Sequence, residues 1–427
     1  MAAKIRILLY SHDTYGLGHL RRSLSIAGQI AQDISHSHQL LLTGSMVAGA
    51  FQLPPRLDMI KLPALSKRSS GAYKARTLPL TLRQTISWRE QMILQAAQAF
   101  RPDLLLVDKS AAGVHGELLP TLRHLKTWSP QTKIVLGMRD IEDSPAKTQA
   151  EWAAGGIYPL LEEVYDRILL YGEPDIFDPA TAYWLPETAV SKLTPCGYLG
   201  RPHSRTDPAR VHRELGLSNG QPLVVLTVGG GGDGYSIIQQ YLDMLRTHAV
   251  PYHSLVVTGP LMAQSKRKLL QQAASLPNLT LREFTPDLMS YLAAADLVVS
   301  MAGYNTVCEI LSLGKRALLI PRSRVRAEQQ MRATLLAERG LVHTLDSHEA
   351  TPARLHHTIT HALAAPAPTA TLPLNGLKRV SAEIGRLLTQ PAMPSNEQSI
   401  LVNRLDHTMQ PLSNHLYPLS FRTESSE

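Results

Sequence analysis

Cysteine is nearly absent from this 427-residue chain, which holds only Cys196 and Cys308. Two thiols can form neither a disulfide framework nor a four-thiolate metal site. Long apolar runs are also missing, because no stretch approaches the ~20 apolar residues that a membrane-spanning helix needs. The short run Ile7–Tyr10 near the N-terminus is too brief for the core of a signal peptide. We therefore expect a cytoplasmic protein.

Several catalytic motifs are missing as well. The chain contains no G-x-x-x-x-G-K-[ST], H-E-x-x-H or C-x-x-C sequence, which argues against phosphate-loop NTPases and zinc proteases. Charge of either sign is modest: 43 basic against 35 acidic residues give a net charge of +8. That excess is compatible with an anionic ligand or a membrane surface, but it is too small to indicate nucleic-acid binding.

Short apolar runs alternate with longer amphipathic stretches, a pattern typical of βα units on a parallel sheet. Strands are predicted from Ile5–Tyr10 onward, and a second series of alternating strands and helices begins at Leu223–Val228. Residues 197–222 between these blocks are rich in glycine and proline, so we expect an interdomain linker there. The sequence thus predicts an α/β protein with Rossmann-like domains at 1–196 and 223–390. Residues 391–427 lack periodicity and are predicted to be a disordered tail.

The first candidate site follows the first predicted strand, where Gly16 and Gly18 precede His19 at a helix start. Glycines allow close backbone approach to a ligand, and free helix N–H groups favour an anion. His19 would lie at the crevice where open α/β sheets bind ligands, and histidine suits proton transfer near neutral pH. A plain turn with a capping histidine is the alternative. Asp108, at the end of another strand, is a second candidate base.

The second candidate is the run of glycines at 229–232, which includes Gly229, Gly230 and Gly231. Residues 229–234 match G-x-G-x-x-G, but the next strand ends in Thr258-Gly259-Pro260 and lacks the acid that binds an NAD ribose. A phosphate-binding loop is therefore favoured over a dinucleotide site.

A third strand, turn and helix start contains Gly303, Asn305 and Thr306, followed by Glu309. Thr306 and Glu309 have the spacing of a capping box. In the functional interpretation the amides of Asn305 and Thr306 bind phosphate, and the Glu309 carboxylate accepts from ribose hydroxyls. Further along, Arg322 suits negative charge, and Gln329 or Gln330 could hydrogen-bond a neutral hydroxylated ligand.

Residues 59–89 contain seven basic side chains and no Asp or Glu. A solvated basic face is one interpretation, and contact with an anionic acceptor or a lipid surface is the other.

This chain resembles the family 28 glycosyltransferases in the run Ser300–Ala333, in the glycines near Val228 and in the pair Gly18-His19. The C-terminal signature of that family is specific over 280–335. The resemblance implies the GT-B architecture, an acceptor-side first domain, a nucleotide-sugar-binding second domain, and no metal ion or cofactor. By that resemblance, Glu309 would hold the ribose of a UDP-sugar, and Gly230, Gly231 and Thr306 would lie by its diphosphate. Gln329 or Gln330 would contact the sugar.

The chain also departs from that family. Arg22 stands where the family has a proline, and Gly18–Ala27 is more similar to the nucleotide-sugar hydrolase of pseudaminic acid synthesis. Tyr304-Asn305 replaces small residues, as in a subgroup of uncharacterised predicted glycosyltransferases. We expect an inverting, metal-independent transferase that uses UDP-N-acetylglucosamine or UDP-glucose and an unknown sugar, lipid or small-molecule acceptor. A nucleotide-sugar hydrolase and a non-enzymatic nucleotide-sugar binder are the alternatives. We also expect peripheral membrane contact through 59–89 and no nucleic-acid partner.

Overall fold

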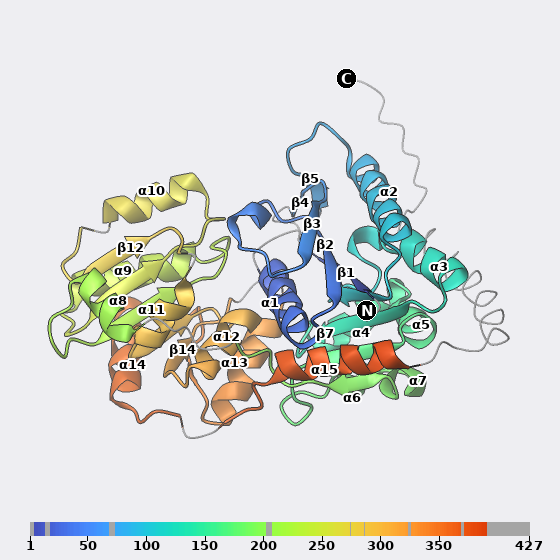
Figure 1. The fold of residues 1–427 in the computed structure, drawn as a ribbon. Coiled ribbons are helices and arrows are strands. Elements are labelled where there is room, and N and C mark those ends of the chain that lie inside the picture. The colour runs from blue at the N-terminus through green and yellow to red at the C-terminus, as the bar shows by residue number, and fades with distance from the viewer. Residues whose placement is uncertain are drawn as a thin grey trace.

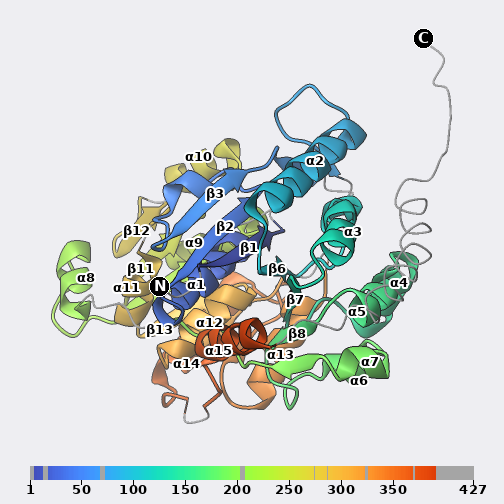
Figure 2. The ribbon, with the colours of Figure 1, turned by 45° about the vertical axis from the view of Figure 1, so that its right-hand side comes forward.

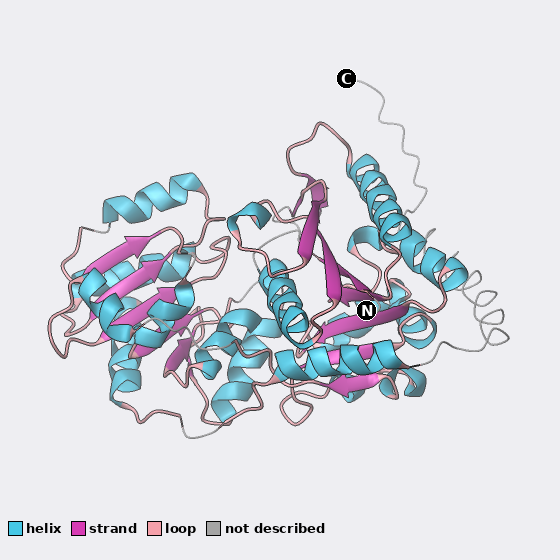
Figure 3. Ribbon diagram, viewed as in Figure 1, coloured by secondary structure: helices cyan, strands magenta, loops and turns pink. Residues whose placement is uncertain are grey.

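A computed structural model describes residues 4–390 of the chain except 13–17, 68–72, 202–206, 274, 286, 323–325 and 369–370. Two parallel sheets lie in two lobes, each with helices on both faces (Figures 1 and 3). The predicted fold class, two Rossmann-like α/β domains, is confirmed. The predicted tail, 391–427, lies outside the described residues.

The first sheet has seven parallel strands in the order β3-β2-β1-β6-β7-β8-β9. Side chains alternate along its central strand: Ile7 and Leu9 join a core cluster on one face, and Leu8 and Tyr10 join a cluster on the other. Both faces are therefore buried, which is why the strand reads as a continuous apolar run. Its strands are β1 (Ile5–Ser11), β2 (Ser37–Thr43), β3 (Leu57–Lys61), β6 (Leu104–Asp108), β7 (Lys133–Arg139), β8 (Arg167–Tyr171) and β9 (Leu193–Pro195).

Helices cover both faces of this sheet, and a small antiparallel hairpin projects from it. The hairpin strands are β4 (Leu65–Lys67) and β5 (Tyr73–Ala75). The helices are α1 (Gly18–Asp33), α2 (Leu82–Phe100), α3 (Leu119–Trp128), α4 (Pro145–Ala154), α5 (Ile157–Glu163), α6 (Pro179–Ala182) and α7 (Glu187–Val190), with 3₁₀ turns at Ala48–Ala50 and Val114–Gly116.

The second sheet has six parallel strands in the order β12-β11-β10-β13-β14-β15. These are β10 (Leu223–Thr227), β11 (His253–Val257), β12 (Leu279–Arg282), β13 (Leu297–Ser300), β14 (Ala317–Leu319) and β15 (His343–Thr344). The helices of this half are α8 (Pro208–Leu215), α9 (Tyr235–Thr247), α10 (Gln264–Ala273), α11 (Leu288–Ala294), α12 (Tyr304–Ser312), α13 (Glu328–Glu338), α14 (Pro352–Ala364) and α15 (Gly376–Thr389).

The chain crosses between the lobes twice, and the two crossings run side by side. Leu199 forms an antiparallel bridge with Asn375, and the Tyr198 amide donates to the Pro373 carbonyl at 3.0 Å. After the second crossing, helix α15 packs against α1 of the first lobe, as Figures 1 and 2 show. Residues 376–389, which the sequence assigns to the second domain, thus lie on the first, where Glu383 pairs with Arg167 at 3.0 Å.

The largest apolar cluster is continuous across the two lobes. It joins Ile7 and Ile30 of the first lobe with Val225 and Val307 of the second. Burying a shared apolar surface favours a fixed arrangement of the lobes, because separating them would expose that surface to water.

Candidate active site

A cavity of about 360 Å³ lies where the carboxyl ends of both sheets meet. This is the edge at which open α/β sheets bind ligands, and the volume falls in the range of small-molecule sites. Of the residues predicted from sequence, those lining the cavity are Gly18, His19, Arg22, Gly229, Gly230, Gly231, Gly303, Asn305, Thr306, Arg322 and Gln329. Asp108, Glu309 and Gln330 do not line it, and Gly16 lies outside the described residues.

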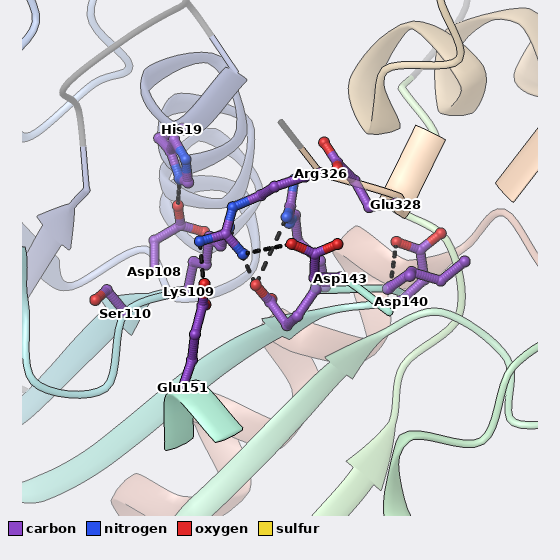
Figure 4. A network of polar contacts seen from close by, with 12 residues as sticks. His19, Asp108, Lys109, Ser110, Asp140, Asp143, Glu151, Arg326 and Glu328 are labelled. Carbon is purple, nitrogen blue, oxygen red and sulfur yellow. Dashed lines mark hydrogen bonds and ion pairs between the residues drawn. The ribbon is translucent and has the colours of Figure 1, made fainter. Parts of the chain in front are cut away.

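His19 and Asp108 form a hydrogen-bonded pair at the first-domain wall of the cavity (Figure 4). His19 Nδ1 lies 2.6 Å from Asp108 Oδ2. The guanidinium of Arg22 holds the same carboxylate with two hydrogen bonds of 2.7 Å. The side chain of Asp108 is 4% exposed, against 16% for His19. Asp108 therefore lies behind the histidine, where it can orient the ring but cannot itself reach a substrate.

The charge on Asp108 fixes the proton on His19. Burial alone would raise the pKa of Asp108, but Arg22 and the hydrogen bond from His19 lower it well below its usual range. An ionised carboxylate only accepts hydrogen bonds, so Nδ1 of His19 carries the proton. Its Nε2 is then left with a lone pair, which is the state a general base requires.

The glycine-rich loop after β10 is shaped partly by close backbone packing. Gly229 and Gly231 have φ angles of +64° and +91°, in the left-handed region that favours glycine. A Cβ on Gly231 would lie 2.2 Å from the Thr258 carbonyl oxygen. Packing against the 258–259 turn thus accounts for glycine at 231, whereas the space beside Gly229 is open.

The N-terminus of helix α12 points at the same cavity. Gly303 is its N-cap residue, and no side chain caps the helix. Thr306 therefore lies inside the helix, and the alternative interpretation of Thr306 and Glu309 as a capping box is wrong. The first N–H groups of a helix have no intrahelical partner and favour an anion. The preceding residue, Ala302, has a φ angle of +57°, which is strained for a residue other than glycine.

Glu309 is fully buried on α12 and faces the first domain. Its Oε1 accepts from Arg21 of α1 and, at 3.0 Å, from Arg201 of the first crossing. Its Oε2 has no hydrogen-bond partner in the part of the chain that the structure describes. The predicted ribose acid is thus engaged by two arginines, and a ribose would have to share or displace them.

Arg322 is held between two carboxylates, Asp233 at 2.9 Å and Glu328 at 2.7 Å. Its backbone N–H donates to Gln329 Oε1 at 3.2 Å. Of the two candidate glutamines, Gln329 lines the cavity and Gln330 does not. Sequence reasoning missed Glu328, which also lines the cavity and whose Oε2 has no hydrogen-bond partner among the described residues. That atom is available to accept from a ligand hydroxyl.

Lys109 follows β6 and Arg139 is the last residue of β7, and both line the first-domain side of the cavity. Both face Glu142, whose Oε2 lies 3.1 Å from Lys109 Nζ and 3.6 Å from Arg139 Nη2. Burial and the neighbouring Arg139 lower the pKa of Lys109 to about 8. Two cations against one carboxylate leave this wall with an excess of positive charge. Their position at strand ends is a signal present in the sequence, although only Asp108, the neighbour of Lys109, was predicted as a site residue there.

Further arginines join the domains around the cavity. Arg326, on the loop before α13, contacts Asp143 at 3.3 Å and Glu151 at 3.2 Å (Figure 4). Arg332 of α13 holds Asp140 with hydrogen bonds of 2.7 and 2.6 Å. Nothing in the local sequence pattern of these arginines indicated partners in the other domain.

The basic segment at 59–89 is only partly a surface. Arg89 is fully buried and pairs with Glu117 through two hydrogen bonds of 2.5 Å, so it does not belong to a solvated or lipid-facing side. Lys74, Arg76 and Arg83 are exposed. In the described part of the chain, no helix has both the length and the apolar character of a membrane span.

Comparison with known proteins agrees with this geometry. Residues 224–378 match the family described as "Glycosyltransferase family 28 C-terminal domain". Relatives include the UDP-N-acetylglucosamine--N-acetylmuramyl-(pentapeptide) pyrophosphoryl-undecaprenol N-acetylglucosamine transferases of Bacillus licheniformis and Exiguobacterium sibiricum. Each is 31% identical, over 152 and 161 residues, covering 35% and 37% of this chain and 41% and 43% of the relative.

Solved structures match over nearly the whole chain. The glycotransferase of kitacinnamycin aligns with a TM-score of 0.56 at 14% identity, covering 96% of this chain and all of that one. A UDP-glucosyltransferase from Polygonum tinctorium aligns with a TM-score of 0.57 at 14% identity, covering 96% and 99%.

This chain has the GT-B fold and carries a family 28-like C-terminal domain at residues 224–378. The family 28-like domain begins at β10 and contains the glycine-rich loop, α12 and α13, so it supplies one complete wall of the cavity. The chain covers about two fifths of the length of the curated relatives that it matches.

Proposed function

We propose that this protein is an inverting, metal-independent glycosyltransferase that moves a sugar from UDP-N-acetylglucosamine or UDP-glucose to a hydroxyl acceptor. The observation that carries the proposal is that His19 of the first domain and the N-terminus of α12 of the second domain line the same cavity. A general base and an anion-binding helix start in one cavity are what this reaction needs.

In the proposed reaction, the acceptor hydroxyl oxygen attacks C1 of the sugar while His19 Nε2 takes its proton. The bond between C1 and the phosphate oxygen breaks, and UDP leaves with the electron pair. Asp108 stabilises the imidazolium that forms. The developing charge on the diphosphate is met by the free amides at the start of α12 and by the loop at 229–232.

The donor wall is assigned by the same proposal. Gly230, Gly231 and Thr306 would lie by the diphosphate and Glu309 by the ribose. Gln329 would contact the sugar, beside the unpartnered Oε2 of Glu328. The relatives named above carry UDP-N-acetylglucosamine in their names, which supports a uridine donor for this chain.

The experiment that tests the proposal is thermal denaturation with UDP-, TDP-, GDP- and ADP-sugars and with NAD, alongside an assay of nucleotide release without acceptor. A ligand at 100 times its Kd adds ~2.7 kcal/mol of stability, which is plain in a melting curve. Stabilisation by a UDP-sugar with slow release supports the transferase, and rapid release identifies a hydrolase. Tight binding without turnover over a broad acceptor panel identifies a non-enzymatic binder, and stabilisation by NAD alone overturns the proposal.

We also propose that the exposed residues Lys74, Arg76 and Arg83, here called the basic face, hold the protein at an anionic membrane on the cytoplasmic side. Trp88 and Leu78, in the same segment, are 47% and 40% exposed, and an exposed tryptophan suits a lipid interface. Binding to anionic vesicles that weakens with salt and is lost when all three basic residues become Glu would support this. The control is a variant in which Lys266 and Lys268 are replaced by Glu, which should bind the vesicles as wild type does. If wild type does not bind anionic vesicles even at low salt, the proposal is contradicted.

A further inference from the structure

Two residues at the start of α12 reach across the domain boundary to the segment that carries His19. Asn305 Nδ2 donates to the carbonyl oxygen of Gly18 at 2.7 Å. This bond uses one of the two N–H donors of the Asn305 side-chain amide. The Tyr304 ring, 4% exposed, lies with its centroid 5.7 Å from the guanidinium carbon of Arg22.

Tyr304 is itself fixed from several sides within the interdomain contact. The guanidinium carbon of Arg332 also lies 5.7 Å from its ring centroid, and Tyr198 stacks on it at 6.1 Å. The Leu199 amide donates to its hydroxyl at 3.2 Å. A ring held by these contacts offers a rigid face to a cation, an attraction that is strongest where water is excluded.

A continuous set of contacts therefore runs from the second domain to the histidine. Asp140 holds Arg332, both arginines lie against Tyr304, and Arg22 holds Asp108, which in turn holds His19. We propose that Tyr304 and Asn305 are positioning residues for His19: Tyr304 aligns Arg22 on Asp108, and Asn305 fixes the backbone at Gly18. The helix that begins at the donor phosphates would thus also set the direction of the base.

The first test follows the imidazole of His19 by NMR titration, without any ligand. The charged or titratable groups recorded against His19 are Asp108, Arg22 and His12, whose ring centroid is 5.3 Å away. In Tyr304→Leu, a displaced Arg22 neutralises less of the Asp108 charge, so we expect His19 to titrate about 0.5 pH unit higher or more. Tyr304→Phe keeps the ring and should restore the wild-type titration.

Tyr235→Leu is the matched control, because Tyr235 is also the first residue of a helix and has Lys266 5.2 Å from its ring. It should leave the His19 titration unchanged. If Tyr304→Leu does not fold, Asn305→Ala decides, because a looser Gly18 backbone weakens the contact with Asp108 and His19 should titrate lower. A folded variant at either position with the wild-type titration overturns that residue's assignment.

The second test is kinetic and rests on the proposed function. In Tyr304→Leu, kcat for UDP release from UDP-N-acetylglucosamine should fall about 10-fold or more, while the Kd for UDP stays within about two-fold of wild type. A parallel loss of UDP affinity would show that Tyr304 supports the donor site instead, and would overturn the inference. If wild type binds no UDP, the proposed function fails, and the titration still decides the positioning role.

Discussion

Arg332 of the second domain and Asp140 of the first form a fully buried, two-pronged ion pair, with both side chains 1% exposed and hydrogen bonds of 2.6 and 2.7 Å. The arginine also donates to the carbonyl oxygen of Ala302 at 3.0 Å. These bonds satisfy charges that would be costly to bury alone. The pair therefore fixes the relative position of β7 and α13, which carry opposite walls of the cavity.

Arg332→Met should lower the free energy of unfolding by about 3–5 kcal/mol, because it leaves Asp140 buried without its partner. Chemical denaturation measures the change. Arg246→Ala is the control, because its partner Asp243 is 36% exposed and Arg246 is 40% exposed, so the expected loss is under ~1 kcal/mol. Equal effects of the two substitutions would show that the buried pair contributes no more than a surface one.

Glu142 should make stability depend on acid pH. Burial alone would raise its pKa, but Lys109 and Arg139 lower it from 4.5 to about 2. Between these values the unfolded chain binds more protons, so the stabilising contribution is present above pH 4.5 and is lost as the pH falls through about 2. At neutral pH the free energy of unfolding of wild type should exceed that of Glu142→Gln by about 1–3 kcal/mol. This difference should shrink toward pH 2. A difference independent of pH would contradict the assignment.

His19→Ala should reduce turnover of a UDP-sugar by about 10²–10⁴-fold, the usual contribution of a general base. Asp108→Asn should also reduce it, because a neutral amide no longer stabilises the imidazolium. Both variants should keep the Kd for UDP within about three-fold in calorimetry, since the proposed diphosphate site is formed by the second domain. Unchanged turnover in His19→Ala would remove the histidine from the reaction.

If the Glu309 carboxylate binds the ribose hydroxyls, Glu309→Gln should weaken the binding of ligands that carry those hydroxyls. We expect wild type to bind UDP about 10-fold more tightly than 2′-deoxy-UDP, and Glu309→Gln to lose most of that preference, because a hydrogen bond to a charged group contributes about 1.5–3 kcal/mol. Comparing two ligands on each protein separates this effect from the loss of stability caused by unpairing Arg21 and Arg201. The same ratio in both proteins would make Glu309 purely an interdomain ion-pair partner.

The local sequence pattern was sufficient to predict the strands and turns that form the cavity. The strands of a doubly covered parallel sheet leave clear apolar runs. Strands were expected at Ile5–Tyr10 and Leu223–Val228, and β1 and β10 are found at Ile5–Ser11 and Leu223–Thr227. The turns at Gly18 and Gly303 were recognisable because each stands between an apolar strand and a helix start. Short edge strands such as β15 (His343–Thr344) escaped prediction, because two residues carry no periodicity.

In the candidate site, too, the local features were predicted from the sequence, whereas the contacts between the domains were not. The α/β fold and the glycine turns follow from the amino-acid sequence, which also points to His19, Asp108 and Arg322, because chemistry-bearing residues at the carboxyl ends of parallel strands share one edge. The folded chain adds three contacts: Arg22 holds Asp108, Arg21 and Arg201 pair with Glu309, and Tyr304 lies between Arg22 and Arg332. Those contacts join residues far apart in the chain, and their partners follow from how the two domains pack, which no local pattern encodes.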